Sequence, residues 1–168
     1  MVALLVIGVC LVCCREIDWF LLKRSLRSKF SDVDWITTQQ LADWLSEKNR
    51  PPPVLFDVRT LAEWNVSHLA GARRVDPNMG AKSAAQGLAK DTPIVTYCSV
   101  GYRSGKMARR LQAAGYTEVR DLEGSIFEWA NEHRPLVRDG NRVSEVHPYN
   151  VTWGRLLQPE VRAAIPRF

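Results

Sequence analysis

The amino-acid sequence predicts an α/β protein whose mainly parallel central sheet is flanked by helices on both faces. First, short apolar runs alternate along the chain with segments of helical periodicity, the pattern of parallel α/β folds. Second, the runs at residues 54–58 and 94–97 contain mostly apolar residues, as strands buried on both faces do. Third, the 168 residues are enough for one domain with its own core and too few for two.

The predicted domain spans residues 34–135 and begins with a short edge strand at Trp35-Ile36. Thr37 and Gln40 then have the spacing of a capping box, so we expect a helix from Thr38 to Glu47. Three consecutive prolines at residues 51–53 end this helix and stiffen the connection to the next strand.

The second strand is predicted at residues 54–59 and carries Asp57 and Arg59 at its carboxyl end, where open α/β sheets bind ligands. Thr60 and Glu63 form a second capping box, which predicts a short helix through Trp64. For Asp57 and Arg59 we expect a supporting role, such as a salt bridge between Arg59 and Glu63, in preference to direct catalysis.

Between this helix and the central strand, the signals are weaker. His68 precedes a strand predicted at residues 72–75, so we expect it to be a structural hydrogen-bonding histidine and not a general base. A weak helix is predicted over residues 79–88.

The central stretch of the chain is residues 94–105, which read as a buried strand, a compact loop and the start of a helix predicted from Ser104 to Ala114. A turn of this kind directs backbone N–H groups towards a ligand at the helix N-terminus. Cys98 lies at the mouth of the loop, so we expect a lowered pKa, with the loop N–H groups contributing most and Arg103 adding its charge. The candidate substrate-binding residues are Ser99, Val100, Gly101, Tyr102, Arg103 and Ser104.

The last strand of the predicted sheet covers residues 118–122. Ser125 is a candidate cap for the following helix, in which Trp129 is expected to be a core residue. Residues 136–168 form a C-terminal extension that we expect to pack on the domain, with His147 and Tyr149 as candidates for lining the pocket.

Composition and charge exclude several classes of function. A net charge of +5 is compatible with nucleic-acid binding, but such a site needs basic residues on one face with aromatic residues between them. Here the basic residues are scattered, apart from Lys23, Arg24, Arg27 and Lys29. Three of the four Cys, at residues 10, 13 and 14, lie in an apolar run without a second pair of ligands, which argues against a zinc site. Cys98 alone falls in the predicted domain, so nothing indicates a disulfide or an oxidising compartment. We expect neither a metal nor a cofactor.

The sequence is compatible with three roles for the N-terminal segment, residues 1–30. The apolar run at residues 2–14 is shorter than the about 20 residues of a membrane span. It could anchor the chain weakly through residues 2–22, act as a secretory signal although it lacks a basic start, or pack on the domain. The basic segment at residues 21–30 is expected to be a solvated helix face or a linker. The expected location is the cytoplasm, with residues 2–22 as a candidate membrane anchor.

The run CSVGYRSG at residues 98–105, with Asp57-Val58-Arg59 before it and Leu122-Glu123-Gly124 after it, resembles the rhodanese-like sulfurtransferases. The likeness extends over residues 35–135, and Cys98, Gly101 and Arg103 match the family's Cys-x-x-Gly-x-Arg loop. Departures from the family pattern include Ser67, Leu69, Ala70 and Ser125. The resemblance implies a rhodanese-like fold in which Cys98 carries a persulfide.

The function that this resemblance implies is transfer of sulfane sulfur from a small anionic donor such as thiosulfate to a thiol, cyanide or protein acceptor. One alternative is a Cys-based phosphatase or arsenate reductase, but the phosphatase loop has one residue more between Cys and Arg than the four here. A shorter loop offers one fewer N–H donor, which suits a single sulfur better than a tetrahedral phosphate. The other alternative is a non-enzymatic sulfur carrier or a module that docks a partner protein.

Overall fold

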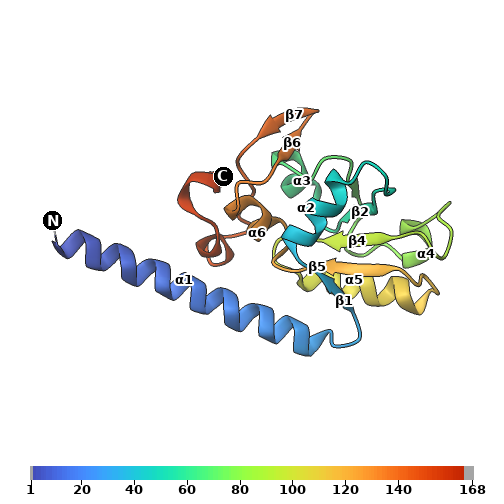
Figure 1. Cartoon of the computed structure of the whole chain (residues 1–168), viewed down its shortest axis with the longest axis horizontal. Coiled ribbons are helices and arrows are strands. Elements are labelled where there is room, and N and C mark those ends of the chain that lie inside the picture. The colour runs from blue at the N-terminus through green and yellow to red at the C-terminus, as the bar shows by residue number, and fades with distance from the viewer. Residues whose placement is uncertain (1, 165–168) are drawn as a thin grey trace.

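The computed structural model describes the backbone of residues 2–164 and the side chains of residues 15–164. Its centre is a five-stranded sheet in the order β1-β5-β4-β2-β3, and every pairing in it is parallel (Figure 1). The strands are β1 (Asp34–Ile36), β2 (Val54–Asp57), β3 (Arg73–Arg74), β4 (Ile94–Tyr97) and β5 (Val119–Leu122). The predicted fold class is therefore confirmed.

Helices cover both faces of this sheet. They are α1 (Val2–Lys29), α2 (Thr38–Ser46), α3 (Leu61–Val66), α4 (Ala81–Ala84), α5 (Tyr102–Ala113) and α6 (Ser125–Asn131). Leu41 of α2 and Phe127 of α6 share one core cluster with Leu55 of β2. On the opposite face, Met107 of α5 packs in a second cluster with Phe56, the next residue of β2. Neighbouring residues of one strand thus serve two cores, which explains why these strands are apolar along their whole length.

Both predicted capping boxes are present and fix where α2 and α3 begin. The hydroxyl of Thr37 accepts a hydrogen bond from the N–H of Gln40, and the Gln40 side chain accepts one from the N–H of Thr37. Thr60 and Glu63 form the same reciprocal pair at the start of α3. Each pair satisfies two N–H groups that a helix N-terminus leaves without partners inside the helix.

The start of α5 and the length of α4 differ from their predicted ranges. The α5 helix begins at Tyr102, two residues before the predicted Ser104, because Gly101 takes the left-handed φ of +115° that closes the loop directly before it. The predicted helix at residues 79–88 is reduced to the single turn of α4.

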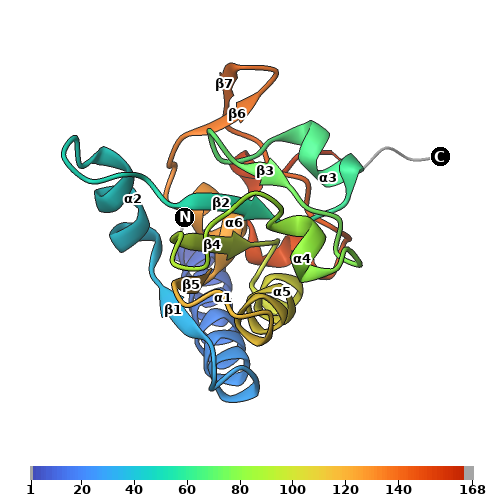
Figure 2. The same ribbon diagram turned by 90° about the vertical axis from the view of Figure 1, so that its right-hand side faces the viewer.

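The C-terminal half of α1 packs on the sheet domain, so residues 21–30 are not a linker; they form a helix that has the expected solvated face and also a buried face that was not expected. Trp19, Leu26 and Phe30 are buried, and Figure 2 shows α1 next to α5. The ring of Phe30 lies so close to Gly105 of α5 that a Cβ on this glycine would be 2.8 Å from a ring carbon. Two basic side chains of this segment form ion pairs with the domain: Lys23 with Glu128 of α6, and Arg27 with Glu123, which follows β5.

Beyond α6 the chain forms an antiparallel hairpin of β6 (Leu136–Arg138) and β7 (Asn141–Val143), followed by the 3-10 helices η1 (Trp153–Leu156) and η2 (Pro159–Val161). This C-terminal segment returns to the first helix. The indole N–H of Trp19 donates to the Leu156 carbonyl at 3.3 Å, and the amide of Asn131 in α6 donates to the same carbonyl at 2.8 Å. The segment is therefore fixed between α1 and α6.

Among the described residues, no helix is both long and apolar enough to cross a membrane. The side chains of the apolar run at residues 2–14, with Cys10, Cys13 and Cys14, lie outside the described residues.

The contact between Phe30 and Gly105 gives a prediction about the attachment of α1. Gly105→Ala should lower the free energy of unfolding by about 1–3 kcal/mol, because the added methyl group overpacks a buried ring. In a Phe30→Ala background the same substitution should be neutral or favourable, since alanine favours a helix over glycine by about 1 kcal/mol. Denaturant unfolding of the four proteins in this cycle measures both costs. Equal penalties in the two backgrounds would show that α1 does not pack at this position.

Candidate active site

The site lies at the carboxyl edge of the sheet, where it is built from the residues that follow three strands. Cys98 directly follows β4, the Asp57–Arg59 pair ends β2, and Gly124 and Ser125 follow β5. The amino end of α6 holds the loop after β4: the N–H of Ile126 donates to the Cys98 carbonyl at 3.2 Å, and the N–H of Phe127 donates to the Ser99 carbonyl at 3.1 Å. Backbone hydrogen bonds from α6 thus fix the position of the loop that carries Cys98.

The Cys98 side chain is only 1% exposed, and it meets the N-terminal end of α5. Its Sγ accepts a hydrogen bond from the N–H of Gly101 at 3.2 Å. Burial raises the pKa of this thiol, but the charge of Arg103 and the dipoles of Ser104 and Gly101 outweigh burial, so the pKa lies below its ordinary value. The largest single lowering contribution is the charge of Arg103 and not a loop N–H group, which reverses the order expected from the sequence.

Glu63, which the sequence analysis names as a helix cap and as a possible partner of Arg59, accepts five hydrogen bonds at the site. Its Oε2 accepts hydrogen bonds from the N–H and hydroxyl of Thr60 at 3.1 and 2.8 Å, and its Oε1 accepts one from the Ser99 hydroxyl at 2.9 Å. The Arg103 guanidinium donates to both oxygens, at 2.8 and 2.6 Å. One carboxylate therefore ties α3 to the Cys98 loop and to the first turn of α5.

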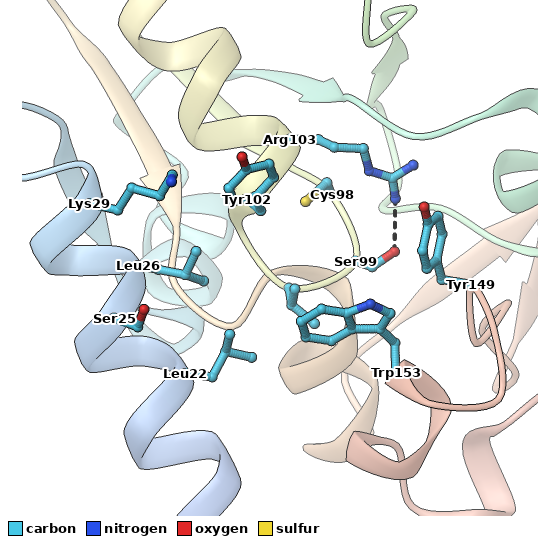
Figure 3. Close-up of a pocket in the computed structure, with 11 residues that line it drawn as sticks. Leu22, Ser25, Leu26, Lys29, Cys98, Ser99, Tyr102, Arg103, Tyr149 and Trp153 are labelled. Atoms are coloured by element: carbon cyan, nitrogen blue, oxygen red, sulfur yellow. Dashed lines mark hydrogen bonds between the residues drawn. The ribbon is translucent and has the colours of Figure 1, made fainter.

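Arg103 is consequently oriented by a protein carboxylate. One of its nitrogens also donates to the Ser99 hydroxyl at 3.0 Å, and the guanidinium lies 5.0 Å from the centre of the Tyr149 ring (Figure 3). Burial raises the pKa of Glu63, but the hydrogen bonds and charge of Arg103 and the hydrogen bonds from Thr60 outweigh it and hold this pKa at about 2. The pair is therefore ionised at neutral pH.

The supporting pair of Asp57 and Arg59 is a salt bridge, as expected, but Arg59 has a different partner from the one suggested. Its Nε and Nη2 donate to the two oxygens of Asp57 at 2.8 and 2.6 Å, and Nη2 also donates to the Ser67 carbonyl at 2.6 Å. Both side chains are 0% exposed. The only link from Arg59 to Glu63 is a 3.5 Å contact with the Glu63 backbone carbonyl. A bidentate geometry of this kind offsets the cost of burying two charges.

Ser125 does not cap α6, contrary to the sequence-based expectation. The helix cap is Gly124, and Ser125 has a left-handed φ of +52°, which is uncommon for a residue with a side chain. Its hydroxyl accepts a hydrogen bond from the Cys98 N–H at 3.1 Å and donates one to the Leu122 carbonyl at 3.2 Å. Ser125 therefore fixes the backbone of Cys98 from the neighbouring strand end.

Asp121 is a second residue that the sequence analysis missed. It lies on β5 beneath the Cys98 loop, fully buried, and the Thr96 hydroxyl donates to its Oδ1 at 2.9 Å. Its Oδ2 and the hydroxyl of Ser104 have no hydrogen-bond partner among the described side chains. Burial first, and then the charge of Cys98, raise the pKa of Asp121 well above its ordinary value. A carboxylate within a strand that is buried on both faces is the signal that could have indicated it.

His68 has the structural character expected of it. Its ring stacks on Trp64 with a centroid distance of 3.6 Å, and its Nδ1 lies 3.3 Å from the Trp64 carbonyl. His147 accepts a hydrogen bond from the Tyr149 N–H and does not line the pocket, whereas Tyr149 does. Within residues 15–164 no group of three His, Cys, Asp or Glu side chains gathers as a metal-binding set.

Cys98 opens into a pocket of about 410 Å³ that lies between α1 and the C-terminal segment (Figure 3). The α1 helix provides one wall, and Tyr149 and Trp153 stand on the opposite side. The lining residues are Leu22, Ser25, Leu26, Lys29, Cys98, Ser99, Val100, Tyr102, Arg103, Tyr149 and Trp153. Of the predicted loop residues, Ser99, Val100, Tyr102 and Arg103 therefore reach the pocket, and Trp153 and the α1 wall were not foreseen.

The hydrogen bonds of Glu63 predict a pH-dependent loss of stability in Glu63→Gln. Because the pKa of Glu63 is lowered from 4.5 to about 2 on folding, its stabilising contribution is complete above pH 4.5 and disappears as the pH falls towards 2. Removing one partner of this largely buried pair should cost on the order of 3 kcal/mol at neutral pH. Denaturant unfolding of both proteins between pH 7 and pH 3 measures the difference. A difference that does not shrink on acidification would contradict the assignment.

The comparisons with known proteins agree with this geometry. Residues 37–132 match the family described as the rhodanese-like domain. The chain is 33% identical over 103 residues to the probable adenylyltransferase/sulfurtransferase MoeZ of Mycobacterium tuberculosis, covering 60% of this chain and 25% of MoeZ. It is 26% identical over 108 residues to the thiosulfate sulfurtransferase GlpE of Pseudomonas fluorescens, covering 58% of this chain and 98% of GlpE. The chain thus spans about a quarter of MoeZ and nearly all of GlpE.

Solved structures show the same architecture. A rhodanese-like domain protein from Staphylococcus aureus is 25% identical with a TM-score of 0.56, covering 64% of this chain and 99% of that one. A thiosulfate sulfurtransferase from Pseudomonas aeruginosa is 27% identical with a TM-score of 0.54, covering 64% of this chain and 20% of that one. Since the family match extends over more than half of the residues, the chain belongs to the rhodanese-like domain family.

Proposed function

We propose that the protein is a sulfurtransferase that moves sulfane sulfur from a small anionic donor such as thiosulfate to a thiol, cyanide or protein acceptor through a persulfide on Cys98. The observation that carries the proposal is the placement of Cys98: a thiol with a lowered pKa, hydrogen-bonded to a loop N–H at the N-terminal end of a helix. The named relatives MoeZ and GlpE are sulfurtransferases, which supports the same class of chemistry.

The proposed reaction has two half-reactions. In the first, the Cys98 thiolate attacks the outer sulfur of the donor, an S–S bond forms on Sγ, and the bond within the donor breaks with its electron pair leaving on sulfite. In the second, an acceptor thiolate or cyanide attacks the outer sulfur of the persulfide and releases the Cys98 thiolate. The sulfur at the loop is an anion both as the Cys98 thiolate and as the persulfide. The same positive end of α5 would therefore stabilise both enzyme forms.

Residues 34–135 would form the catalytic unit, with residues 1–30 and 136–168 as additions that complete its pocket. Gly101 and Ser104 would contribute donors at the anionic sulfur, since both lower the pKa of Cys98. Arg103 would supply positive charge from its place on Glu63, while Asp57 and Arg59 would hold the neighbouring strand end.

The phosphatase or arsenate reductase alternative has less support. A phosphate needs a guanidinium fork that faces the substrate, because a bidentate contact satisfies two phosphate oxygens. The fork of Arg103 is already occupied by the two oxygens of Glu63. A single sulfur needs only the loop N–H groups and a positive charge nearby.

The first prediction for this function concerns Cys98. Cys98→Ser should fold like the wild type and lose sulfur transfer completely, because a serine oxygen does not form a persulfide here. Intact mass after incubation with thiosulfate should show one added sulfur on the wild type and none on the variant. Measurable thiosulfate:cyanide transfer by Cys98→Ser would refute the proposed nucleophile.

The second prediction concerns Arg103. Alkylation rate against pH should give the wild-type thiol an inflection below the ordinary value of about 8.5. Arg103→Gln should move this inflection upward, because the charge of Arg103 is the largest single contribution that lowers the pKa. Arg103→Lys keeps the charge and should shift the inflection less. An unchanged inflection in Arg103→Gln would assign the stabilisation to the loop N–H groups alone.

A further inference from the structure

The pocket above Cys98 is larger and more apolar than a small inorganic donor requires. Its volume of about 410 Å³ falls in the range of about 300–1,000 Å³ that is typical of sites for organic ligands. Thiosulfate is a compact, strongly hydrated dianion, and apolar walls add nothing to its binding because they cannot replace its water. The apolar walls therefore indicate a substrate that also has an apolar part.

These walls come from parts of the chain that lie outside the family match at residues 37–132. Leu22 and Leu26 of α1 form one side, and Trp153 of η1 stands opposite them in Figure 3. Both sides are fixed in place: Leu26 packs on Gly101, at 3.3 Å from a Cβ built there, and η1 is tied to Trp19 of α1 by a hydrogen bond. The pocket is therefore preformed and not a gap between loose segments.

The pocket combines an anion-binding region around Cys98 with apolar walls. The sulfur of Cys98 marks the reacting end, where the N-terminus of α5 and the charge of Arg103 favour an anion. The Nζ of Lys29 lies 5.4 Å from the centre of the Tyr102 ring and adds a second cation to the pocket lining. Apart from Ser25 on α1, the remainder of the wall offers mainly aliphatic and aromatic surface. A ligand that fits both regions has an anionic sulfur end and an apolar body.

We propose that the pocket selects organic sulfur compounds that carry an apolar body, about the size of an aromatic ring, on the sulfur next to the transferred sulfur. This inference rests on the proposed sulfurtransferase function and names its substrate class. The body occupies the same place in both half-reactions, because in each it is joined to the atom next to the transferred sulfur. The class therefore covers an organic thiosulfonate as donor and an organic thiol as acceptor.

In the donor half-reaction, the Cys98 thiolate attacks the outer sulfur of R–SO₂–S⁻ and forms the Sγ–S bond. The bond between the two donor sulfurs breaks, and its electron pair leaves with the sulfinate R–SO₂⁻. In the acceptor half-reaction, R–S⁻ attacks the outer sulfur of the persulfide and leaves as R–S–S⁻, while the Cys98 thiolate is regenerated. Neither half-reaction needs an additional oxidant or reductant.

The test compares thiosulfate, methanethiosulfonate and benzenethiosulfonate as donors to the full chain. Each kcat/KM is divided by the rate of the same donor with a small thiolate in solution, which removes differences in intrinsic reactivity. The ratio of the benzene compound to the methane compound should be at least about tenfold, the discrimination that a filled hydrophobic pocket provides. Equal normalised values for the two compounds in this half-reaction, together with equal values for acceptors, would overturn the inference.

The acceptor arm uses protein that has first been loaded with sulfur from thiosulfate. Thiophenol and 2-mercaptoethanol are compared as acceptors in the same normalised way. Discrimination in the donor arm identifies a thiosulfonate site, and discrimination in the acceptor arm identifies a thiol site; either supports the inference. Failure to load any sulfur on Cys98 from any donor would instead refute the proposed function itself.

Variants from both walls separate recognition from structure. Trp153→Ala and Leu22→Ala should each lower the aromatic-to-methyl ratio severalfold. Val151→Ala is the matched control, because this residue is 72% exposed, lies two positions before Trp153 and does not line the pocket. Its ratio should equal that of the wild type. If the wall variants reduce all donors by the same factor, the walls are structural and the inference fails.

Discussion

The carboxylate of Glu63 is the interaction on which the geometry of the site depends. Five donor contacts from Thr60, Ser99 and Arg103 converge on its two oxygens, and the carboxylate is almost completely buried. Through it, the first turn of α3 fixes both the loop after β4 and the guanidinium that lowers the pKa of Cys98. Preorganisation of this kind lets the loop stabilise an anionic sulfur without rearranging.

The sequence predicts well the features that depend on local rules. The apolar strands, both capping boxes and the placement of Cys98 between a strand and a helix follow from residue spacing alone, and all are present. The partner of Arg59 was not predictable in the same way. Asp57 and Glu63 both lie within its reach along the chain, and only the tertiary position of α3 decides between them.

The features that the sequence did not reveal involve contacts between distant segments. Trp19, Leu22, Leu26 and Phe30 recur at helical spacing, a signal that could have identified the buried face of α1. The surrounding lysines and arginines concealed it, since their pairing with Glu123 and Glu128 becomes visible only in three dimensions. The second role of Glu63 was hidden for the same reason, because a residue that caps a helix already has a sufficient local explanation.

The hydrogen bond between Trp19 and the Leu156 carbonyl spans 137 residues of sequence. During synthesis the N-terminal portion of a chain emerges first and can begin to fold before the rest is made. The sheet, α1 and the Cys98 loop are therefore synthesised before Tyr149 and Trp153. The pocket gains its second wall only when this last segment docks. The wall formed by Tyr149 and Trp153 is thus the part of the pocket that is synthesised last, although it faces a thiol that lies more than fifty residues earlier in the chain.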